Sequence, residues 1–285
     1  RAEEILEAGD SDLVTIGRGL LCDAHFVNKC ASGRRQELRQ CIGCLQGCYE
    51  ELAKERSLTC IYNPFVGREA EEKQTASRKK TVWIVGAGPA GMEAARVAAL
   101  RGHSVTLFDS RHELGGQVGL AATPPGKEEF KQIVRYYKYE LARLGIAIKL
   151  GHTVTVEEIL AGNPDAVILA VGSNSLMLPL PGLDQTNVIS AREVLAGASC
   201  GNKVVVCGGG LVGLETAIYL ANRGKSVEVI EMLDKLAGDA GPLNRTRLLQ
   251  EFAEAKIPAY TNTKLVGVKG DQVLVEIANR SESLK

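Results

Sequence analysis

The sequence predicts an α/β protein in which one strand–helix–strand (βαβ) pattern occurs twice. Residues 81–109 and 203–231 carry this prediction. Each stretch joins an apolar β-branched run, a G-x-G-x-x-G turn, a helical pattern and a second apolar run that ends in an acid. Four cysteines spaced C-x2-C-x3-C-x11-C precede the repeat, within residues 41–60. The chain has 285 residues, enough for about two domains.

The spacing of the glycines indicates what each βαβ unit binds. The first glycine permits the tight turn out of the strand, the second lets the backbone approach a pyrophosphate, and the third lets the helix pack on the strand. Free N–H groups at the helix N-terminus then face the phosphates, and the acid 18 residues after the third glycine can accept hydrogen bonds from ribose. We therefore expect two dinucleotide sites. Their residues are Gly86, Gly88, Pro89, Ala90, Gly91 and Asp109 in the first unit, and Gly208, Gly210, Leu211, Val212, Gly213 and Glu231 in the second.

Weaker patterns predict the elements around the two units. Apolar residues at helical spacing predict an amphipathic helix over 128–145 and another helix over 246–257. We expect a short strand at 146–150 and a buried strand within 164–173 that ends at Gly172. Residues 264–277 predict a hairpin that turns at Gly270-Asp271.

Composition narrows the function classes. Lys and Arg together number 34 and so do Asp and Glu, so no net charge favours nucleic acid or an anionic membrane as a partner. No apolar run is long enough to span a bilayer, and the N-terminus has no signal-peptide core. We expect a cytoplasmic protein with reduced thiols. The four cysteines outside the motif are expected to be small buried apolar residues, and the four histidines have no partner at catalytic spacing.

The four clustered cysteines admit three interpretations. A disulfide staple is disfavoured by the expected reducing compartment. Four thiolates would suit zinc, although zinc ribbons usually pair two C-x2-C knuckles. Three close thiolates and one distant thiolate can also occupy the four corners of an iron–sulfur cubane. A redox-active cluster beside a flavin domain is chemically useful, so the residues favour iron–sulfur and leave zinc open.

The chain resembles flavoenzymes of the old yellow enzyme-like class, which includes 2,4-dienoyl-CoA reductase, trimethylamine dehydrogenase and bacterial NADH:flavin oxidoreductases. The resemblance rests on "DLVTIGRGLLCDAHFVNK", the cysteine spacing, "NPFVGRE", "GAGPAG", "LGGQ" and "GGGLVGLE". In that class an FMN-binding TIM barrel is followed by a 4Fe–4S cluster and an FAD-type domain with an inserted nucleotide domain. The resemblance implies that Gly17 and Arg18 contact the FMN phosphate. It also implies the cluster ligands Cys41, Cys44, Cys48 and Cys60 and the further FAD contacts Gly116, Gln117 and Gly172.

The resemblance also implies a domain order. Residues 1–30 would be the last strand and helix of the FMN barrel, and 31–75 the cluster segment. Residues 80–190 would form the FAD-binding domain without its closing strands, and 191–285 the inserted NAD-binding domain. The expected fold is thus two Rossmann-like βαβ domains preceded by a barrel remnant and a cysteine-rich segment. On this interpretation the chain is a fragment of a longer enzyme, and its catalytic residues lie in the missing barrel.

The implied function is an NADH-dependent flavin oxidoreductase of the enoate or dienoyl-CoA reductase type. Electrons would pass from NADH through FAD, the 4Fe–4S cluster and FMN to an activated C=C bond. The first βαβ unit would bind FAD, because "LGGQ" follows it and we expect no such loop after the second, which would bind NADH. A small unsaturated substrate is the expected partner, and the sequence allows a homo-oligomer.

Three other functions remain open. An amine dehydrogenase of the same architecture would pass electrons to a partner flavoprotein, and a glutamate-synthase-like subunit would feed electrons to another subunit. A zinc-organised module would not be catalytic. A disulfide reductase is excluded, because residues 113–126 contain no cysteine pair.

Overall fold

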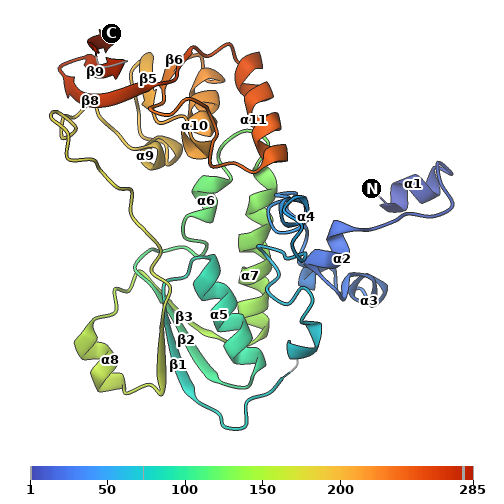
Figure 1. Ribbon diagram of the computed structural model, residues 1–285. Coiled ribbons are helices and arrows are strands. Elements are labelled where there is room, and N and C mark those ends of the chain that lie inside the picture. Colours follow the sequence, from blue (N-terminus) through green and yellow to red (C-terminus); the bar gives the residue numbers. More distant parts are fainter. Residues whose placement is uncertain (1, 73, 278–279, 285) are drawn as a thin grey trace. The chain divides into compact units, whose positions relative to one another are not determined.

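The computed structural model describes residues 2–72, 74–277 and 280–284, and the side chains of residues 2–72 and 74–277. It contains two compact units (Figure 1). The first comprises Arg1–Gly116 and Gln132–Val171, and the second Gln117–Lys131 and Gly172–Lys285. Within the described part of the chain, no helix is long and apolar enough to cross a membrane.

The first unit is built on a parallel sheet of four strands. Its order is β3-β2-β1-β4. The strands are β1 (Thr81–Val85), β2 (Ser104–Asp109), β3 (Ala147–Leu150) and β4 (Ala166–Leu169). Helices α5 (Pro89–Leu100), α7 (Lys131–Arg143) and α8 (Val156–Gly162) accompany the sheet. Ile84, Met92, Leu107, Phe108 and Leu141 form its solvent-free core.

The local predictions for this unit hold, with one correction. The predicted helix at 128–145 is present as a 3-10 turn (Glu128–Phe130) followed by α7. The strand predicted at 146–150 is β3. The strand predicted as buried and ending at Gly172 is β4, but it ends earlier, at Leu169, which is 70 % exposed. Among the described strands, β4 pairs with β1 alone and so forms an edge of the sheet, where its end is less covered.

The second unit repeats the βαβ arrangement and adds an antiparallel sheet. Its parallel sheet has the order β5-β6-β7, and its antiparallel sheet the order β10-β9-β8. The parallel strands are β5 (Lys203–Cys207), β6 (Ser226–Ile230) and β7 (Ala259–Tyr260). The antiparallel strands are β8 (Thr263–Lys269), β9 (Gln272–Ile277) and β10 (Arg280–Leu284). The helices are α6 (Val118–Ala121), α9 (Ala191–Leu195), α10 (Leu211–Ala221) and α11 (Pro242–Glu254).

The predicted hairpin is β8–β9, with its turn at Gly270-Asp271. The helix predicted at 246–257 is α11, which begins earlier, at Pro242. Proline is well suited to the first helical position, because its fixed φ fits the helix and its missing N–H would have no partner there. The core of the unit lies between α10, β6 and α11, with Leu214, Ala217, Val229, Leu248 and Phe252 buried.

The N-terminal region has little regular structure. It holds three short helices, α1 (Ala2–Glu7), α2 (Arg18–Cys22) and α3 (Phe26–Ala31). The predicted barrel strand before Gly17 does not form, because the described residues offer it no neighbouring strand to pair with. The cysteine-rich segment contains 3-10 turns at Arg35–Glu37 and Glu69–Glu71 and the helix α4 (Tyr49–Ala53).

A buried guanidinium attaches this segment to the rest of the first unit. Arg39 is 4 % exposed. Its guanidinium donates to the Tyr62 carbonyl at 2.8 Å, to Glu93 on α5 at 3.1 Å and to the Tyr136 hydroxyl on α7 at 3.2 Å. Arg96 also donates to Glu93, to its two carboxylate oxygens at 2.8 Å and 2.9 Å. Burial opposes the charge of Glu93, but hydrogen bonds and charge from Arg96 and Arg39 keep the pKa of this carboxyl below its ordinary value.

We predict that Arg39→Met lowers the free energy of unfolding by about 2–3 kcal/mol, because it removes one of the two guanidinium partners of the buried Glu93 and a donor to the Tyr62 carbonyl. Urea unfolding monitored by circular dichroism measures this change. Arg35→Met is the matched control, since the Arg35 side chain is 73 % exposed; it should change stability by less than about 0.5 kcal/mol. Equal stability of the two variants would contradict the anchoring role of Arg39.

Candidate functional site

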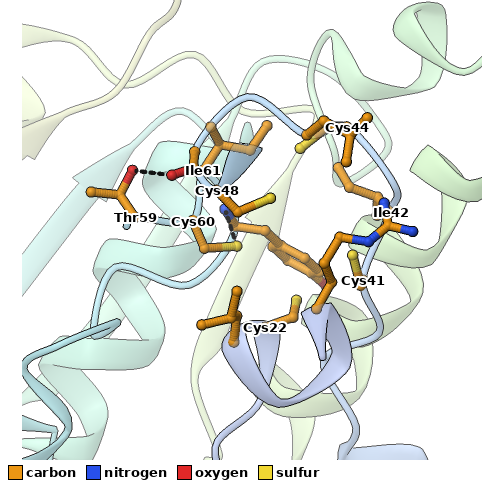
Figure 2. A pocket seen from close by; sticks show the side chains of 13 residues that line it. Cys22, Cys41, Ile42, Cys44, Cys48, Thr59, Cys60 and Ile61 are labelled. Carbon is orange, nitrogen blue, oxygen red and sulfur yellow. Dashed lines mark hydrogen bonds between the residues drawn. The ribbon is translucent and has the colours of Figure 1, made fainter. Parts of the chain in front are cut away.

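The four clustered cysteines meet at one cavity in the first unit. Cys41, Cys44, Cys48 and Cys60 line it, and Figure 2 shows their sulfur atoms facing the same space. A fifth thiol, Cys22, also lines the cavity. The sequence predicts Cys22 as a small buried residue, and it is 2 % exposed. Its place beside the motif was missed, because no spacing links it to the four cysteines.

The thiols surround the cavity and do not converge on one point. Among the described residues, no group of three or more His, Cys, Asp or Glu side chains is placed to share one metal ion. A mononuclear zinc site requires four ligands at about 2.0–2.3 Å from the same ion. In a cubane each thiolate binds a different iron, so the sulfurs stand around the cluster. Four thiols that line one cavity therefore fit the ligand set of a cluster.

One thiol of the cavity, Cys60, is stabilised as a thiolate. Gly43 N–H points at the Cys41 sulfur at 3.5 Å, and Tyr62 N–H at the Cys60 sulfur at 3.4 Å. The pKa of Cys60 is lowered to about 6, chiefly by a hydrogen bond from the Cys22 thiol. Burial works against this shift, and backbone N–H groups and the Arg39 charge add to it. Burial raises the pKa of Cys44.

Gly47 lets the two halves of the cysteine segment touch. A Cβ at this position would lie 2.8 Å from Cys60 Cα and 2.8 Å from the Thr59 carbonyl oxygen. The Gly47 carbonyl accepts from Thr59 N–H at 2.8 Å and from the Thr59 hydroxyl at 3.0 Å. This close approach brings Cys48 and Cys60, which are distant in sequence, to the same cavity.

One residue that lines the cavity carries a buried hydroxyl with no partner among the described residues. Tyr62 lines the cavity and is 5 % exposed. Within the described residues its hydroxyl makes no hydrogen bond, a state that costs about 1–3 kcal/mol. A bound group with acceptor atoms, such as the sulfides of a cluster, would supply the missing partner. This orphaned donor and the ring of thiols together fit an iron–sulfur cluster.

The glycine-rich turn of the first βαβ unit has the geometry its spacing predicts. Gly86 has φ +107° and donates its N–H to the Phe108 carbonyl at 2.8 Å. A Cβ on Gly91 would collide with the Gly86 carbonyl oxygen. Gly88 ends the turn as the N-cap of α5, and a Cβ there would meet nothing within 4 Å. The space beside Gly88 is therefore open to a ligand.

The acid of the first unit is held by the turn itself. Asp109 accepts from Ala87 N–H at 2.6 Å and from Arg111 N–H at 2.8 Å. Each oxygen retains a free lone pair for a ribose hydroxyl. Gly116 lies against this turn, since a Cβ on it would be 2.9 Å from Gly88 Cα. Pro89 and Ala90 form the first residues of α5, as expected.

Two further predicted FAD contacts belong to the second compact unit. Gln117 donates from its side-chain amide to the Ser173 carbonyl at 2.9 Å. Gly172 has φ +72°, and a Cβ on it would lie 3.7 Å from the same amide nitrogen. Gln117 and Gly172 are therefore neighbours within that unit.

The turn of the second βαβ unit repeats the first. Gly208 has φ +111° and donates its N–H to the Ile230 carbonyl at 2.9 Å. A Cβ on Gly213 would collide with the Gly208 carbonyl oxygen. Glu231 accepts from Gly209 N–H at 2.6 Å and from Leu233 N–H at 2.8 Å. Glu231 is 8 % exposed, so a ribose would reach it only at the edge of the turn.

The remaining residues of the second turn begin α10. Gly210 is the N-cap, and Leu211 and Val212 are the first two helical residues. Leu211 N–H already has a partner, because it donates to the Asp239 carboxylate at 2.8 Å.

The expectation that the second unit has no counterpart of "LGGQ" is wrong. Ala237 N–H donates to the Gly209 carbonyl at 2.7 Å, just as Gly115 N–H donates to the Ala87 carbonyl at 2.9 Å. "LAGD" at 236–239 thus stands where "LGGQ" stands at 114–117. Both segments begin five residues after the acid, so extending the repeat past the acid would have revealed the match.

The two predicted FMN contacts lie beside the cysteine cavity. Gly17 is the N-cap of α2, and its carbonyl accepts from Leu20 N–H at 3.0 Å. Arg18 is exposed and lines the cysteine cavity. The fold alone assigns neither residue to FMN.

A protein-family model described as pyridine nucleotide-disulphide oxidoreductase matches residues 80–284. The chain belongs to this family. The family implies binding of FAD and of NAD(P)H and an oxidoreductase activity. The matched region holds two cysteines, Cys200 and Cys207, and neither lies in the loop after the first acid. The shared feature is therefore the pair of nucleotide-binding units.

Relatives extend the similarity across the N-terminal region. A bilirubin reductase of Mediterraneibacter gnavus (strain CC55_001C) is 39 % identical over 285 residues, 99 % of this chain and 44 % of its own length. An NADH oxidase of Thermoanaerobacter brockii is 42 % identical over 269 residues, 91 % of this chain and 41 % of its own length. A solved 2-naphthoyl-CoA reductase complexed with 2-naphthoyl-CoA has a TM-score of 0.93 and 32 % identity, covering 99 % of this chain and 43 % of that protein.

These similarities confirm the resemblance to the old yellow enzyme-like and dienoyl-CoA reductase class. The chain spans less than half the length of each of these three proteins.

We predict that Gly47→Ala disrupts the cysteine cavity, because the added Cβ would meet backbone atoms of Thr59 and Cys60. The cost should be about 1–3 kcal/mol, as for overpacking elsewhere. Gly43→Ala is the matched control: it has φ +66° but free space around its Cβ, so it should cost about 1 kcal/mol. Thermal unfolding of the two variants compares them, and a larger loss for Gly43→Ala would contradict the packing argument.

Proposed function

We propose that the chain is the electron-input part of an NADH-dependent flavin oxidoreductase of the enoate or dienoyl-CoA reductase type. The observation that carries the proposal is the position of the cysteine cavity. Its segment is tied by Arg39 to α5, the helix whose N-terminus forms the first dinucleotide turn. A cluster in the cavity and a flavin at that turn would thus be held by one compact unit.

In this proposal hydride from NADH reduces FAD, and single electrons pass through a 4Fe–4S cluster to FMN, which reduces an activated C=C bond. Cys41, Cys44, Cys48 and Cys60 would ligate the cluster. Tyr62 would donate its orphaned hydroxyl to it. The reductase names of the relatives support an unsaturated substrate, and the bilirubin and naphthoyl-CoA reductases favour a conjugated one.

The chain's own residues would place the nucleotides. The open space beside Gly88 and the free N–H groups of α5 suit the pyrophosphate of FAD. Gly116 lies against the same turn, and Gln117 follows it in sequence. Gly17 and Arg18 would bind the FMN phosphate, the latter as a cation beside the cluster cavity.

The second unit would take NADH in preference to NADPH. Glu231 stands at the end of β6, where a 2′-phosphate would meet like charge. The next two residues, Met232 and Leu233, provide no arginine to compensate. Lys235 is the nearest cation in sequence and would soften the preference.

Two alternatives are less well supported. An amine dehydrogenase whose second unit binds no nicotinamide does not explain a complete glycine motif with its acid. A zinc-organised module requires thiols that converge on one ion, and the thiols of this cavity stand around it.

We predict that the anaerobically reconstituted chain contains about four irons and four sulfides per chain, the stoichiometry of one cubane. Cys48→Ser should lose most of the iron, because a ligand is removed. Cys22→Ser is the matched control, since it lines the same cavity outside the motif, and it should retain the iron. Metal and acid-labile sulfide analysis measures both. Stoichiometric zinc without iron would overturn the cluster proposal.

We predict that Gly88→Val folds normally and loses FAD, because its side chain enters space that is free of protein atoms. FAD affinity should fall roughly tenfold or more. Gly91→Val provides the contrast, since its Cβ collides with the Gly86 carbonyl and should prevent folding. Flavin fluorescence and circular dichroism separate the two effects. If Gly88→Val kept FAD and lost NADH affinity alone, the assignment of the two units would be reversed.

A further inference from the structure

The two βαβ units differ in charge at one equivalent position. After each glycine-rich turn comes a Leu-x-Gly-x segment whose second residue donates its N–H to a carbonyl of that turn. The fourth residue of this segment is the position that differs. That residue is the neutral Gln117 after the first glycine-rich turn and the anionic Asp239 after the second. Beside the second glycine-rich turn, a carboxylate thus stands in place of an amide.

Asp239 reaches the N-terminus of α10. Its Oδ1 accepts from Leu211 N–H, the first helical residue, at 2.8 Å. A Cβ built on Gly210 would lie 3.1 Å and 3.2 Å from the two carboxylate oxygens. The carboxylate therefore uses a backbone donor that a bound pyrophosphate would otherwise receive, at the electropositive end of an eleven-residue helix.

The segment that carries Asp239 is fixed against the turn. Ala237 is fully buried and bonded to Gly209, and a Cβ on Gly209 would lie 2.5 Å from the Leu236 side chain. Arg245 on α11 donates to the Leu236 carbonyl at 3.1 Å. The contacts of Leu236 and Ala237, just before Asp239, thus fix the backbone from which its carboxylate reaches the helix.

Two carboxylates already lie against the second glycine-rich turn. Glu231 accepts a hydrogen bond from Gly209 N–H, and Asp239 accepts one from Leu211 N–H, two residues further along the chain. A pyrophosphate brings two further negative charges to the same donors. Asp239 is exposed, so its side chain is free to rotate toward solvent when an anion arrives.

We propose that Asp239 is the affinity-determining residue of the second dinucleotide unit: it occupies a pyrophosphate donor of α10 when the nucleotide is absent and has to release it when the nucleotide binds. This inference rests on the proposed function, in which the second unit binds NADH. It adds that the unit weakens its own affinity for any ligand with a pyrophosphate.

The test is calorimetric titration of ADP-ribose and of adenosine into the 285-residue chain. All variants carry Gly88→Val, so that the first unit contributes little binding. Asp239→Asn keeps an oxygen that can accept from Leu211 N–H. Asp239→Gln introduces the residue type of Gln117, the equivalent residue after the first turn. Asp234→Asn is the matched control, because it removes an exposed charge from the same segment.

Both Asp239 variants should bind ADP-ribose roughly three- to tenfold more tightly than their parent. Asp234→Asn should leave the affinity unchanged, and adenosine, which has no phosphate, should bind every variant equally. Unchanged or weaker ADP-ribose binding by folded Asp239 variants, with binding by the parent, would overturn this inference alone. Failure of the parent and all variants to bind ADP-ribose or NADH would overturn the nucleotide role of the second unit as well.

Discussion

The buried pair of Arg39 and Glu93 is the contact on which the first unit depends. The cysteine segment has few large apolar side chains, so hydrophobic burial alone does not fix it to the sheet. Arg39 instead uses directional bonds. Its backbone N–H donates to Asp23 at 3.0 Å, and its guanidinium reaches the Tyr62 carbonyl and Glu93. It thereby joins the N-terminal helices, the segment after Cys60 and helix α5.

This anchoring gives a physical reason for one compact unit. An ion pair buried with several hydrogen bonds allows little movement between the elements that it joins. The rings of Tyr62, Tyr136 and Tyr137 pack edge-on beside the pair, with centroids 5.2–5.9 Å apart. The segment that forms the cavity and the helix that begins at the first dinucleotide turn therefore pack against the same buried residues of the first compact unit.

The sequence predicts what depends on neighbouring residues and misses what depends on distant ones. Glycine turns and the cysteine cavity were predictable, because their spacing alone defines the chemistry. Arg39 is 54 residues from its partner Glu93 and 97 residues from its partner Tyr136. No local sequence pattern around Arg39 indicates either partner. The position of Asp239 was predictable, because aligning the two repeats past their acids places it opposite Gln117. The barrel strand before Gly17 failed to form for a third reason, since a strand needs a partner that the described residues do not provide.

The proposed function requires that electrons from NADH reach a cluster in the cysteine cavity. Low-temperature electron paramagnetic resonance of the anaerobically reconstituted chain, with saturating FAD, tests it most directly. We expect added NADH to produce the signal of a reduced cluster, matching the signal that dithionite produces. A cluster that dithionite reduces and NADH leaves oxidised would contradict the proposed electron path.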